Sequence, residues 1–386
     1  MLNSPLFLQP TSPTQTDAEL RRMLSIEPAI TTTSSAAARH TTARGEMDKW
    51  ENIGAGSCGA VFAPYGRSQV IKVAKKEGND LWNDFFMHAK ILRSVIKYPE
   101  LRVKFPRCLG FILKDTDFFS NKPSLKNLAS NFCTIPADVL VSERILPLPE
   151  ATRSRLIDKF CPPALRTTAY ADEANKDCLV RPYLGARTRN LSNRYFSLRN
   201  FKMYIDKMEL LQLDIPSIAS SMGEALAVIH WDAQTDGGDI EFVIGSSSML
   251  DMSFLNEPLD TSEKKDVGPP SNYLEDFFRR VTQLYCLDFN QVRPITMDED
   301  GVDAAINAFK ANAPYFPRPL RSSAIERKAW DAFVQAYMVM AETILKNEDE
   351  KVRDLPAMFL RKIIAMEQAK KQLAARQSSD MLQEYL

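Results

Sequence analysis

A glycine-rich segment has the spacing of a phosphate-binding loop. Gly54, Gly56 and Gly59, followed by Val61, match the pattern G-x-G-x-x-G-x-V. Glycine has no Cβ, so its backbone can approach a phosphate closely. A dinucleotide-binding loop would open a helix and a Walker loop would end in Gly-Lys-Ser/Thr, whereas this loop runs into a predicted strand. The pattern therefore favours a glycine-rich hairpin lying over nucleotide phosphates, as in protein kinases.

A lysine follows this loop at the separation that kinases use. Lys72 lies within the apolar run 70–74, the predicted third strand, where its ammonium would offset the charge on the α and β phosphates. Lys75 is the alternative candidate, and a solvent-exposed lysine on an edge strand is the purely structural interpretation. Glu143, in the predicted strand 139–145, is a further candidate nucleotide-binding residue.

The helix predicted after this strand carries the candidate partner of the lysine. Kinases orient the lysine with a glutamate on this helix, and the apolar frame of residues 80–95 puts His88 at that position. A neutral histidine can accept a hydrogen bond from lysine, and a buried structural histidine is the equal alternative. Asp84, one turn earlier on the same face, is the other source of the missing negative charge.

Three aspartates follow in the order in which kinases carry a base and two metal ligands. Asp232 ends a His-Trp-Asp segment and is the candidate catalytic base. Asp239 directly precedes an apolar run, Asp288 lies in Leu-Asp-Phe-Asn, and both are candidate ligands of Mg²⁺, which prefers carboxylate oxygen. The loop after Asp232 is two residues longer than in kinases, so Asp236 is a rival for either role. A helix cap or a turn is the structural alternative for Asp288.

These motifs are distributed over two predicted lobes. Residues 1–46, rich in Ser, Thr, Pro and Ala, are expected to be a disordered tail, with residues 18–24 as a short helix. Residues 47–148 give the pattern of strands near residues 50, 60, 70, 106 and 139 and of one helix, with a polar insertion at 115–136. Residues 149–386 are mostly helical in pattern, for example at 203–211 and 273–278, with short apolar runs at 240–244 and 284–287. The predicted fold class is α+β: a bilobal, kinase-like fold with a small antiparallel sheet lobe and a larger helical lobe.

Composition excludes other classes of protein. The chain has 386 residues with 49 basic and 49 acidic side chains, so no global field favours nucleic acid or an anionic membrane. No apolar run reaches the ~18–20 residues of a membrane span. The six cysteines and three histidines are scattered without zinc-finger spacing, so we expect no zinc. Dispersed cysteines and the lack of a secretory pattern predict an intracellular protein, cytoplasmic or nuclear.

Several longer segments give a family resemblance. Residues 287–302, the Pro-Tyr-Phe-Pro-Arg-Pro segment at 314–319, and residues 230–243 resemble a fungal family of unknown function, domain of unknown function 3669, whose members are often labelled "zinc finger protein". The resemblance covers about residues 50–345 and implies an intracellular fungal protein without an established activity. It also implies that the position of Asp232 need not be an aspartate in the family, which weakens the base assignment more than the metal assignments.

The sequence thus supports two hypotheses. The first is a phosphotransferase that uses ATP and Mg²⁺ on a small molecule, in the manner of aminoglycoside or choline kinases. The second is a pseudokinase or adaptor that binds nucleotide or only a protein partner. Both require one spatial arrangement: Lys72 must lie close to Asp239 and Asp288 beneath the glycine-rich hairpin.

Overall fold

The computed structural model describes residues 15–26, 30–31, 49–188, 195–248, 261–266 and 280–384. The first half is a five-stranded antiparallel sheet in the order β2-β3-β4-β6-β5. Its strands are β2 (Trp50–Ala55), β3 (Gly59–Pro64), β4 (Gln69–Ala74), β5 (Cys108–Ile112) and β6 (Val139–Glu143). The expected strands near residues 50, 60, 70, 106 and 139 are all present, and the small antiparallel sheet is confirmed.

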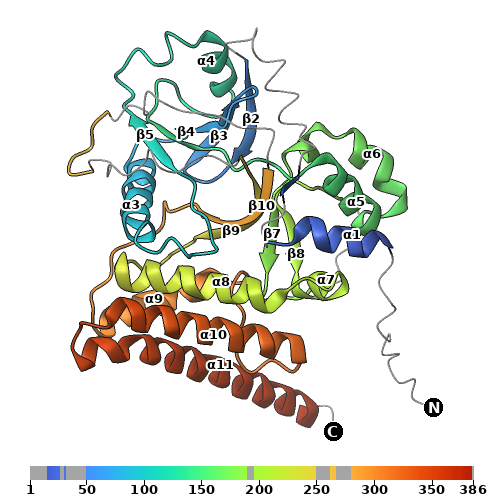
Figure 1. Cartoon of the computed structure of the whole chain (residues 1–386), viewed down its shortest axis with the longest axis vertical. Coiled ribbons are helices and arrows are strands. Elements are labelled where there is room, and N and C mark those ends of the chain that lie inside the picture. The colour runs from blue at the N-terminus through green and yellow to red at the C-terminus, as the bar shows by residue number, and fades with distance from the viewer. Residues whose placement is uncertain are drawn as a thin grey trace.

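Helix α3 (Asp80–Val95) joins the two halves of the molecule. Its bounds match the predicted helix because the apolar residues recur at helical spacing. Phe85 packs into the core under the first sheet, whereas Ile91, two turns further on, packs into the core of the second half. Figure 1 shows α3 running from β5 down to α8. Side chains near its middle therefore lie between the two cores.

The segment between β5 and β6 differs from its prediction as a polar insertion. It contains α4 (Pro123–Ala129), which Pro123 helps to begin because proline suits the first turn of a helix. Leu125 and Ala129 are fully buried in the core of the first sheet, together with Phe119. The sequence of this segment is polar overall, but its few apolar residues lie on one side and cover the sheet.

The second half contains a sheet that the sequence did not predict. Its order is β1-β10-β9-β7-β8, with one parallel pair, β7 with β8. The strands are β1 (Ile30–Thr31), β7 (Val180–Tyr183), β8 (Phe201–Tyr204), β9 (Glu241–Ser248) and β10 (Arg280–Leu287). The predicted apolar runs became β9 and β10, but β7 and β8 are too short to show alternation. The lobe expected to be helical is therefore mixed.

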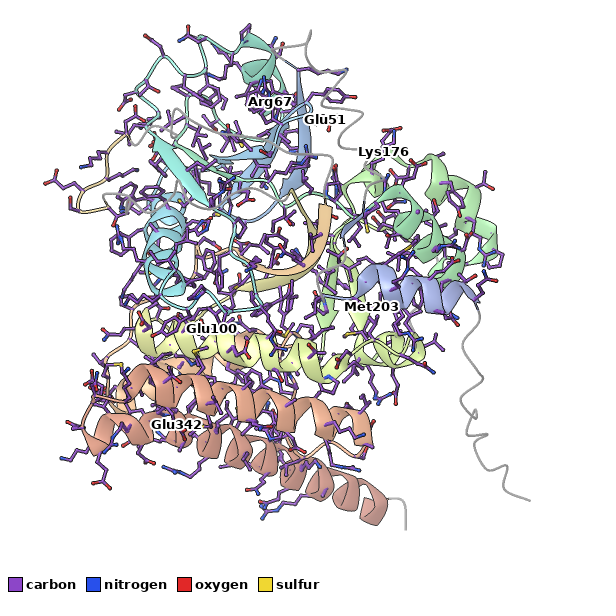
Figure 2. All side chains as sticks on the ribbon, in the orientation of Figure 1. Glu51, Arg67, Glu100, Lys176, Met203 and Glu342 are labelled. Carbon is purple, nitrogen blue, oxygen red and sulfur yellow. The ribbon has the colours of Figure 1, made fainter. Side chains whose placement is uncertain are left out.

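Helices stack on the far side of this sheet, where Figure 1 shows α8, α10 and α11 lying one beneath the other. They are α7 (Ile205–Leu210), α8 (Ile215–Ala227), α9 (Glu299–Ala311), α10 (Ala324–Leu345) and α11 (Glu350–Glu384). A Cβ on Gly223 of α8 would lie 2.5 Å from the Phe333 carbonyl oxygen, so glycine lets α8 and α10 approach closely. Met203 of β8 is fully buried above this stack, whereas Glu342 of α10 is exposed (Figure 2).

Short helical segments follow the first sheet. They are α5 (Glu150–Phe160), α6 (Arg166–Ala171) and the 3₁₀ turns Pro163–Leu165 and Glu173–Asp177. The helix expected over residues 203–211 is instead the end of β8 followed by α7. The helix expected at 273–278 lies outside the described residues. No helix in the described ranges is long and apolar enough to span a bilayer.

The described residues of the N-terminal segment, 15–26 and 30–31, include a helix and a short strand that contact the second half. Helix α1 (Gln15–Leu24) contains the short helix predicted over residues 18–24. Leu20 and Leu24 are buried in the core of the second half, and β1 pairs with β10. Asp17 also forms an ion pair with Lys159 of α5 at 2.7 Å. The two buried leucines contribute apolar burial that the composition of the segment did not predict.

Candidate functional site

The ammonium group of Lys72 joins the two halves of the molecule. Strand β4 places Lys72 opposite Val61 on one side and Leu140 on the other. Its Nζ lies 2.7 Å from Asp84 Oδ2 in α3 and 2.9 Å from Asp288 Oδ1, which directly follows β10. Burial disfavours the charge on this lysine, but the two carboxylates outweigh that effect and raise the pKa of Lys72 well above its ordinary value. The ammonium is therefore charged and held in position.

Asp84 fixes the position of both the lysine and the segment after β10. Its Oδ2 pairs with Lys72, and its Oδ1 accepts a hydrogen bond of 3.0 Å from the backbone N–H of Phe289. Its side chain is only 5% exposed, so both oxygens are satisfied away from water. Of the two candidate partners of Lys72 on this helix, Asp84 and His88, it is Asp84 that contacts the ammonium group.

His88 does not reach Lys72, which corrects the expectation that it orients the lysine. Its Nε2 donates a hydrogen bond of 2.6 Å to the carbonyl oxygen of Pro106. Its ring packs on Phe289 with centroids 4.9 Å apart, and Phe289 also stacks on Phe105. Burial lowers the pKa of His88, so the ring is neutral. One helical turn separates the two candidates, and packing of the histidine against Phe289 leaves Asp84 nearest to the lysine.

The glycine-rich segment forms the hairpin between β2 and β3, directly beside Lys72. The Gly56 N–H donates to the Gly59 carbonyl oxygen at 2.8 Å and closes the turn. A Cβ on Gly59 would lie 2.8 Å from Lys72 Cγ and 3.0 Å from the Val73 carbonyl oxygen, whereas one on Gly54 would meet only ordinary contact distances. Gly59 is thus the glycine that lets the hairpin pack against the lysine.

Lys75, the alternative phosphate-binding lysine, has a different place. Its Nζ donates to the Gly56 carbonyl oxygen at 2.7 Å, and its backbone N–H donates to the Cys58 carbonyl oxygen. Lys75 therefore holds the tip of the hairpin, and Lys72 is the lysine that contacts the acidic groups.

Asp239 and Asp288 lie near each other at the ends of paired strands. Leu287, the residue before Asp288, is opposite Glu241, two residues after Asp239. Burial raises the pKa of Asp288, Lys72 opposes that effect, and the carboxylates of Asp84 and Asp239 add to it. Asp239 and Asp288 have positive φ angles of 58° and 67°. Such backbone conformations cost about 1–3 kcal/mol and cluster at functional sites.

The surroundings of Asp239 and Asp288 determine which kind of metal ion the two carboxylates could bind. Asp239 is exposed, and its Oδ2 accepts a hydrogen bond of 2.6 Å from Gln291. Within the described ranges no three His, Cys, Asp or Glu side chains are grouped to hold a metal ion. Mg²⁺ at nucleotide sites takes one or two carboxylates and completes its shell with phosphates and water. The pair Asp239 and Asp288 fits a metal that arrives with phosphates, not an independent metal site.

Asp232 lies apart from this group. A π-helical turn at Val228–Asp232 ends α8, and the Asp232 carboxylate accepts hydrogen bonds of 2.7 Å from Lys97 and from the Tyr98 hydroxyl. Burial would raise the pKa of Asp232, but hydrogen bonds from Lys97, Tyr98 and Ser94 lower it. Ser94 is ten residues beyond Asp84, about 15 Å along the helix. This placement does not support Asp232 as a base acting beside Lys72.

Asp236, its rival, is committed to the backbone. Its Oδ1 accepts hydrogen bonds from the backbone N–H groups of Gly238 at 2.9 Å and Arg293 at 2.8 Å. Burial raises the pKa of Asp236. These bonds tie the loop before β9 to the segment after β10, so Asp236 positions Asp239 relative to Asp288.

Glu143 has a structural partner at the end of β6. Its carboxylate pairs with Arg107 Nε at 3.1 Å and accepts a bond from the Arg107 backbone N–H. The Glu143 N–H donates to the Arg107 carbonyl oxygen at 2.9 Å. Its carboxylate and its amide are therefore both engaged in joining β6 to the start of β5.

One comparison with known proteins gave a match. The model of a protein family described as "Zinc finger protein", a family of unknown function, matches residues 284–349. No curated protein matches the chain. The matched segment begins in β10, includes Asp288 and extends through α9 and α10. Part of the candidate site therefore lies inside the segment that the family model matches.

The family description does not fit the donors in this segment. Residues 284–349 contain one cysteine, Cys286, and no histidine. Cys286 is buried, and burial raises the pKa of its thiol well above the ordinary value. A zinc finger requires four thiolate or imidazole ligands in close pairs. The matched segment lacks them.

One charged pair beside the site was missed by sequence reasoning. Glu241 of β9 pairs with Arg181 of β7, with Arg181 Nη2 2.6 Å from Glu241 Oε2. Burial raises the pKa of Glu241 to about 7; Arg181 opposes this shift, and Asp288 and Asp239 add to it. The sequence did contain one indication of this pair: Glu241 is a charged residue inside the otherwise apolar run 240–244.

Proposed function

We propose that this protein binds a nucleoside triphosphate with Mg²⁺ in a kinase-like, two-lobed arrangement. The observation that carries the proposal is the double contact of Lys72 Nζ with Asp84 and Asp288, beneath the hairpin at Gly59. A lysine on the third strand, an acidic partner on the next helix and an aspartate after a two-stranded hairpin are the parts that kinases use around their phosphates.

The packing around Phe289 supports the same proposal. Phe289 follows Asp288, as phenylalanine follows aspartate in the kinase motif, and its ring packs on those of His88 and Phe105. This stack joins α3 to the second half, so the distance between Lys72 and Asp288 is set by side-chain packing as well as by charge. A preorganised ammonium needs little rearrangement when a ligand arrives.

Each residue has a defined task in this proposal. Lys72 exchanges its contact with Asp288 for phosphate oxygens and keeps Asp84 as its partner. Asp239 and Asp288 would hold Mg²⁺, which when bound neutralises phosphate charge. The backbone of the hairpin covers the phosphates, and Lys75 keeps its tip in place. A metal that arrives with the nucleotide would also offset the repulsion between the neighbouring carboxylates of Asp239 and Asp288.

Thermal unfolding with and without nucleotide tests the proposal. Millimolar ATP or GTP with Mg²⁺ should raise the melting temperature, since a ligand at 100 times its dissociation constant adds about 2.7 kcal/mol of stability. Lys72→Met and Asp288→Asn should remove most of the shift, and Lys76→Met, on the exposed neighbour, should retain it. If no nucleoside triphosphate shifts the wild-type transition, the proposal is wrong.

The bonds made by Asp232 favour a second candidate, an adaptor or pseudokinase that binds nucleotide without transferring phosphate. A base must be within hydrogen-bond reach of the hydroxyl that it deprotonates, and Asp232 is engaged by Lys97 and Tyr98 instead. The first candidate, a small-molecule phosphotransferase, requires turnover. Release of γ-phosphate across a panel of hydroxyl acceptors, abolished by Asp288→Asn, would establish it. Binding without turnover would establish the adaptor.

A further inference from the structure

A cavity of about 190 Å³ lies between the end of α1 and the start of α8. Residues from the range 21–26 form one side of it, and residues from the range 212–218 form the other. Arg21 Nη1 donates a hydrogen bond of 2.8 Å to Gln212 Oε1 across this boundary. Figure 1 shows α1 beside α7, the helix that precedes α8. The cavity is therefore complete only while α1 is docked on the second half.

The inner wall of the cavity is aliphatic. Leu24, Leu213 and Ile218 line it, and all three are buried in the core of the second half. Ile26, which is partly buried against the same core, lines it as well. Burial of a polar group against such a wall costs free energy, whereas burial of an aliphatic group is favourable. The inner wall therefore suits a ligand with a branched or linear hydrocarbon body.

Two exposed side chains of opposite charge also line the cavity. Arg21 belongs to α1, and Asp214 directly precedes α8. Asp214 Oδ1 caps α8 by accepting a hydrogen bond of 3.0 Å from the Ser217 backbone N–H. Among the residues that the structure describes, Arg21 donates only to Gln212, and neither Arg21 nor Asp214 forms an ion pair. Each can therefore pair with a charged group of a ligand.

The volume of the cavity limits the ligand to a small molecule. A cavity of about 150 Å³ holds one benzene molecule, so about 190 Å³ holds roughly six to nine non-hydrogen atoms. Pockets for drug-sized ligands measure about 300–1,000 Å³, so a nucleotide is too large. This cavity is therefore independent of the nucleotide site proposed above.

We infer that the cavity binds a free aliphatic α-amino acid of about the size of leucine. The ligand's carboxylate accepts from the Arg21 guanidinium, its ammonium donates to Asp214, and its side chain lies against Leu24, Leu213 and Ile218. A carboxylic acid leaves Asp214 without a partner, and an amine leaves Arg21 without one. Because the ligand contacts both α1 and the start of α8, it also stabilises the docked position of α1.

Calorimetric titration of the full chain with amino acids and their analogues tests the inference. At least one of leucine, isoleucine, valine and methionine should bind. For leucine, 4-methylpentanoate lacks the ammonium and 3-methylbutylamine lacks the carboxylate, and each should bind about fivefold more weakly, since an exposed charge pair contributes modestly. Alanine keeps both charges but loses three carbon atoms, and should bind more weakly by about tenfold or more.

Two variants each remove one charge and keep the local helix signals. Asp214→Asn retains an N-cap, because asparagine caps a helix about as well as aspartate, and Arg21→Gln retains a good helix former. Each should weaken leucine binding by about fivefold while the free protein unfolds as the wild type does. Arg22→Gln is the matched control, because Arg22 is the exposed neighbour on α1 and does not line the cavity. It should bind leucine with wild-type affinity.

Hydrogen exchange at α1 locates the ligand without relying on the heat of binding. Bound leucine should slow exchange of the amide hydrogens of residues 20–24, since a ligand that requires docked α1 opposes its local opening. ATP with Mg²⁺ should not displace leucine. Unchanged exchange at α1, displacement by ATP, equal binding of leucine and 4-methylpentanoate, or wild-type affinity in Arg21→Gln or Asp214→Asn would each overturn the inference. Failure of all four amino acids to bind would overturn it too.

Discussion

At the residue scale, the site depends on how one ammonium is shared between two carboxylates. Asp84 is 5% exposed and Asp288 is 31% exposed, so the two ion pairs differ in burial. The buried partner also accepts the Phe289 N–H and cannot move without leaving that donor unpaired. The more exposed partner has no such constraint. Asp288 is therefore the carboxylate that can release Lys72 to a phosphate.

The sequence predicted that Lys72 and Asp288 lie close together, but it left two candidates, Asp84 and His88, for the partner of Lys72 on α3. Lys72 and Asp288 were predicted because each lies in or beside a short apolar strand that fixes its position. The choice between Asp84 and His88 depended on the rotation of α3, which contact with Phe289 decides. Glu241 and Arg181 come from strands that are 60 residues apart in the chain, so no local pattern could pair them.

Titration of Glu241 should make stability fall as pH rises through the neutral range. Its folded pKa is raised from 4.5 to about 7, so the folded state holds a proton that the unfolded state loses first. Stability therefore decreases between about pH 4.5 and 7, by up to about 3 kcal/mol. Urea unfolding at pH 5, 6, 7 and 8 should show this loss in the wild type and a flatter profile in Glu241→Gln. Parallel profiles for the two proteins would contradict the assignment.

At the element scale, the hairpin between β2 and β3 depends on one glycine more than on the others. A side chain at Gly59 would meet Lys72 close to its backbone and also the Val73 carbonyl oxygen, and neither can move freely. A side chain at Gly54 would meet only Val61 Cβ, at 3.9 Å. The three-glycine motif thus combines one position required by packing with two that leave space for a ligand.

Gly59→Ala should destabilise the protein and weaken nucleotide binding, whereas Gly54→Ala should change stability little. Overpacking of this kind costs about 1–3 kcal/mol and would displace Lys72. Thermal unfolding and nucleotide titration of both variants check the difference. Equal stability of the two variants would mean that the hairpin is not packed against Lys72 as described.

The elements that the sequence failed to predict share a physical cause. Strands β7 and β8 are four residues long, and β7 contains Pro182, so neither shows a strand pattern by itself. Helix α1 was predicted in part, over residues 18–24, but its packing through Leu20, Leu24 and ion pairs to α5 was not. Such elements owe their stability to tertiary contacts, which local propensity does not contain.

At the scale of the whole molecule, the two halves are joined by buried side chains as well as by the candidate site. Helix α3 contributes Phe85 to one core and Ile91 to the other. The Lys104 backbone, between α3 and β5, also exchanges hydrogen bonds with Leu284 and Cys286 of β10. A ligand bound at Lys72 and Asp288, as proposed, would act on this same junction.

Because α3 belongs to both cores, the described protein should unfold in one cooperative transition rather than lobe by lobe. Phe85→Ala should lower the free energy of unfolding by about 3–5 kcal/mol and Ile91→Ala by about 2–5 kcal/mol, because both side chains are fully buried and each truncation leaves a cavity. Each variant should shift the whole unfolding transition, and calorimetry and tryptophan fluorescence should report the same shift. Asp80→Asn, at the exposed start of α3, is the control and should leave the transition temperature unchanged. Two resolved transitions, with Phe85→Ala moving one and Ile91→Ala the other, would show that the halves fold independently and that the Lys72–Asp288 contact is too weak to couple them.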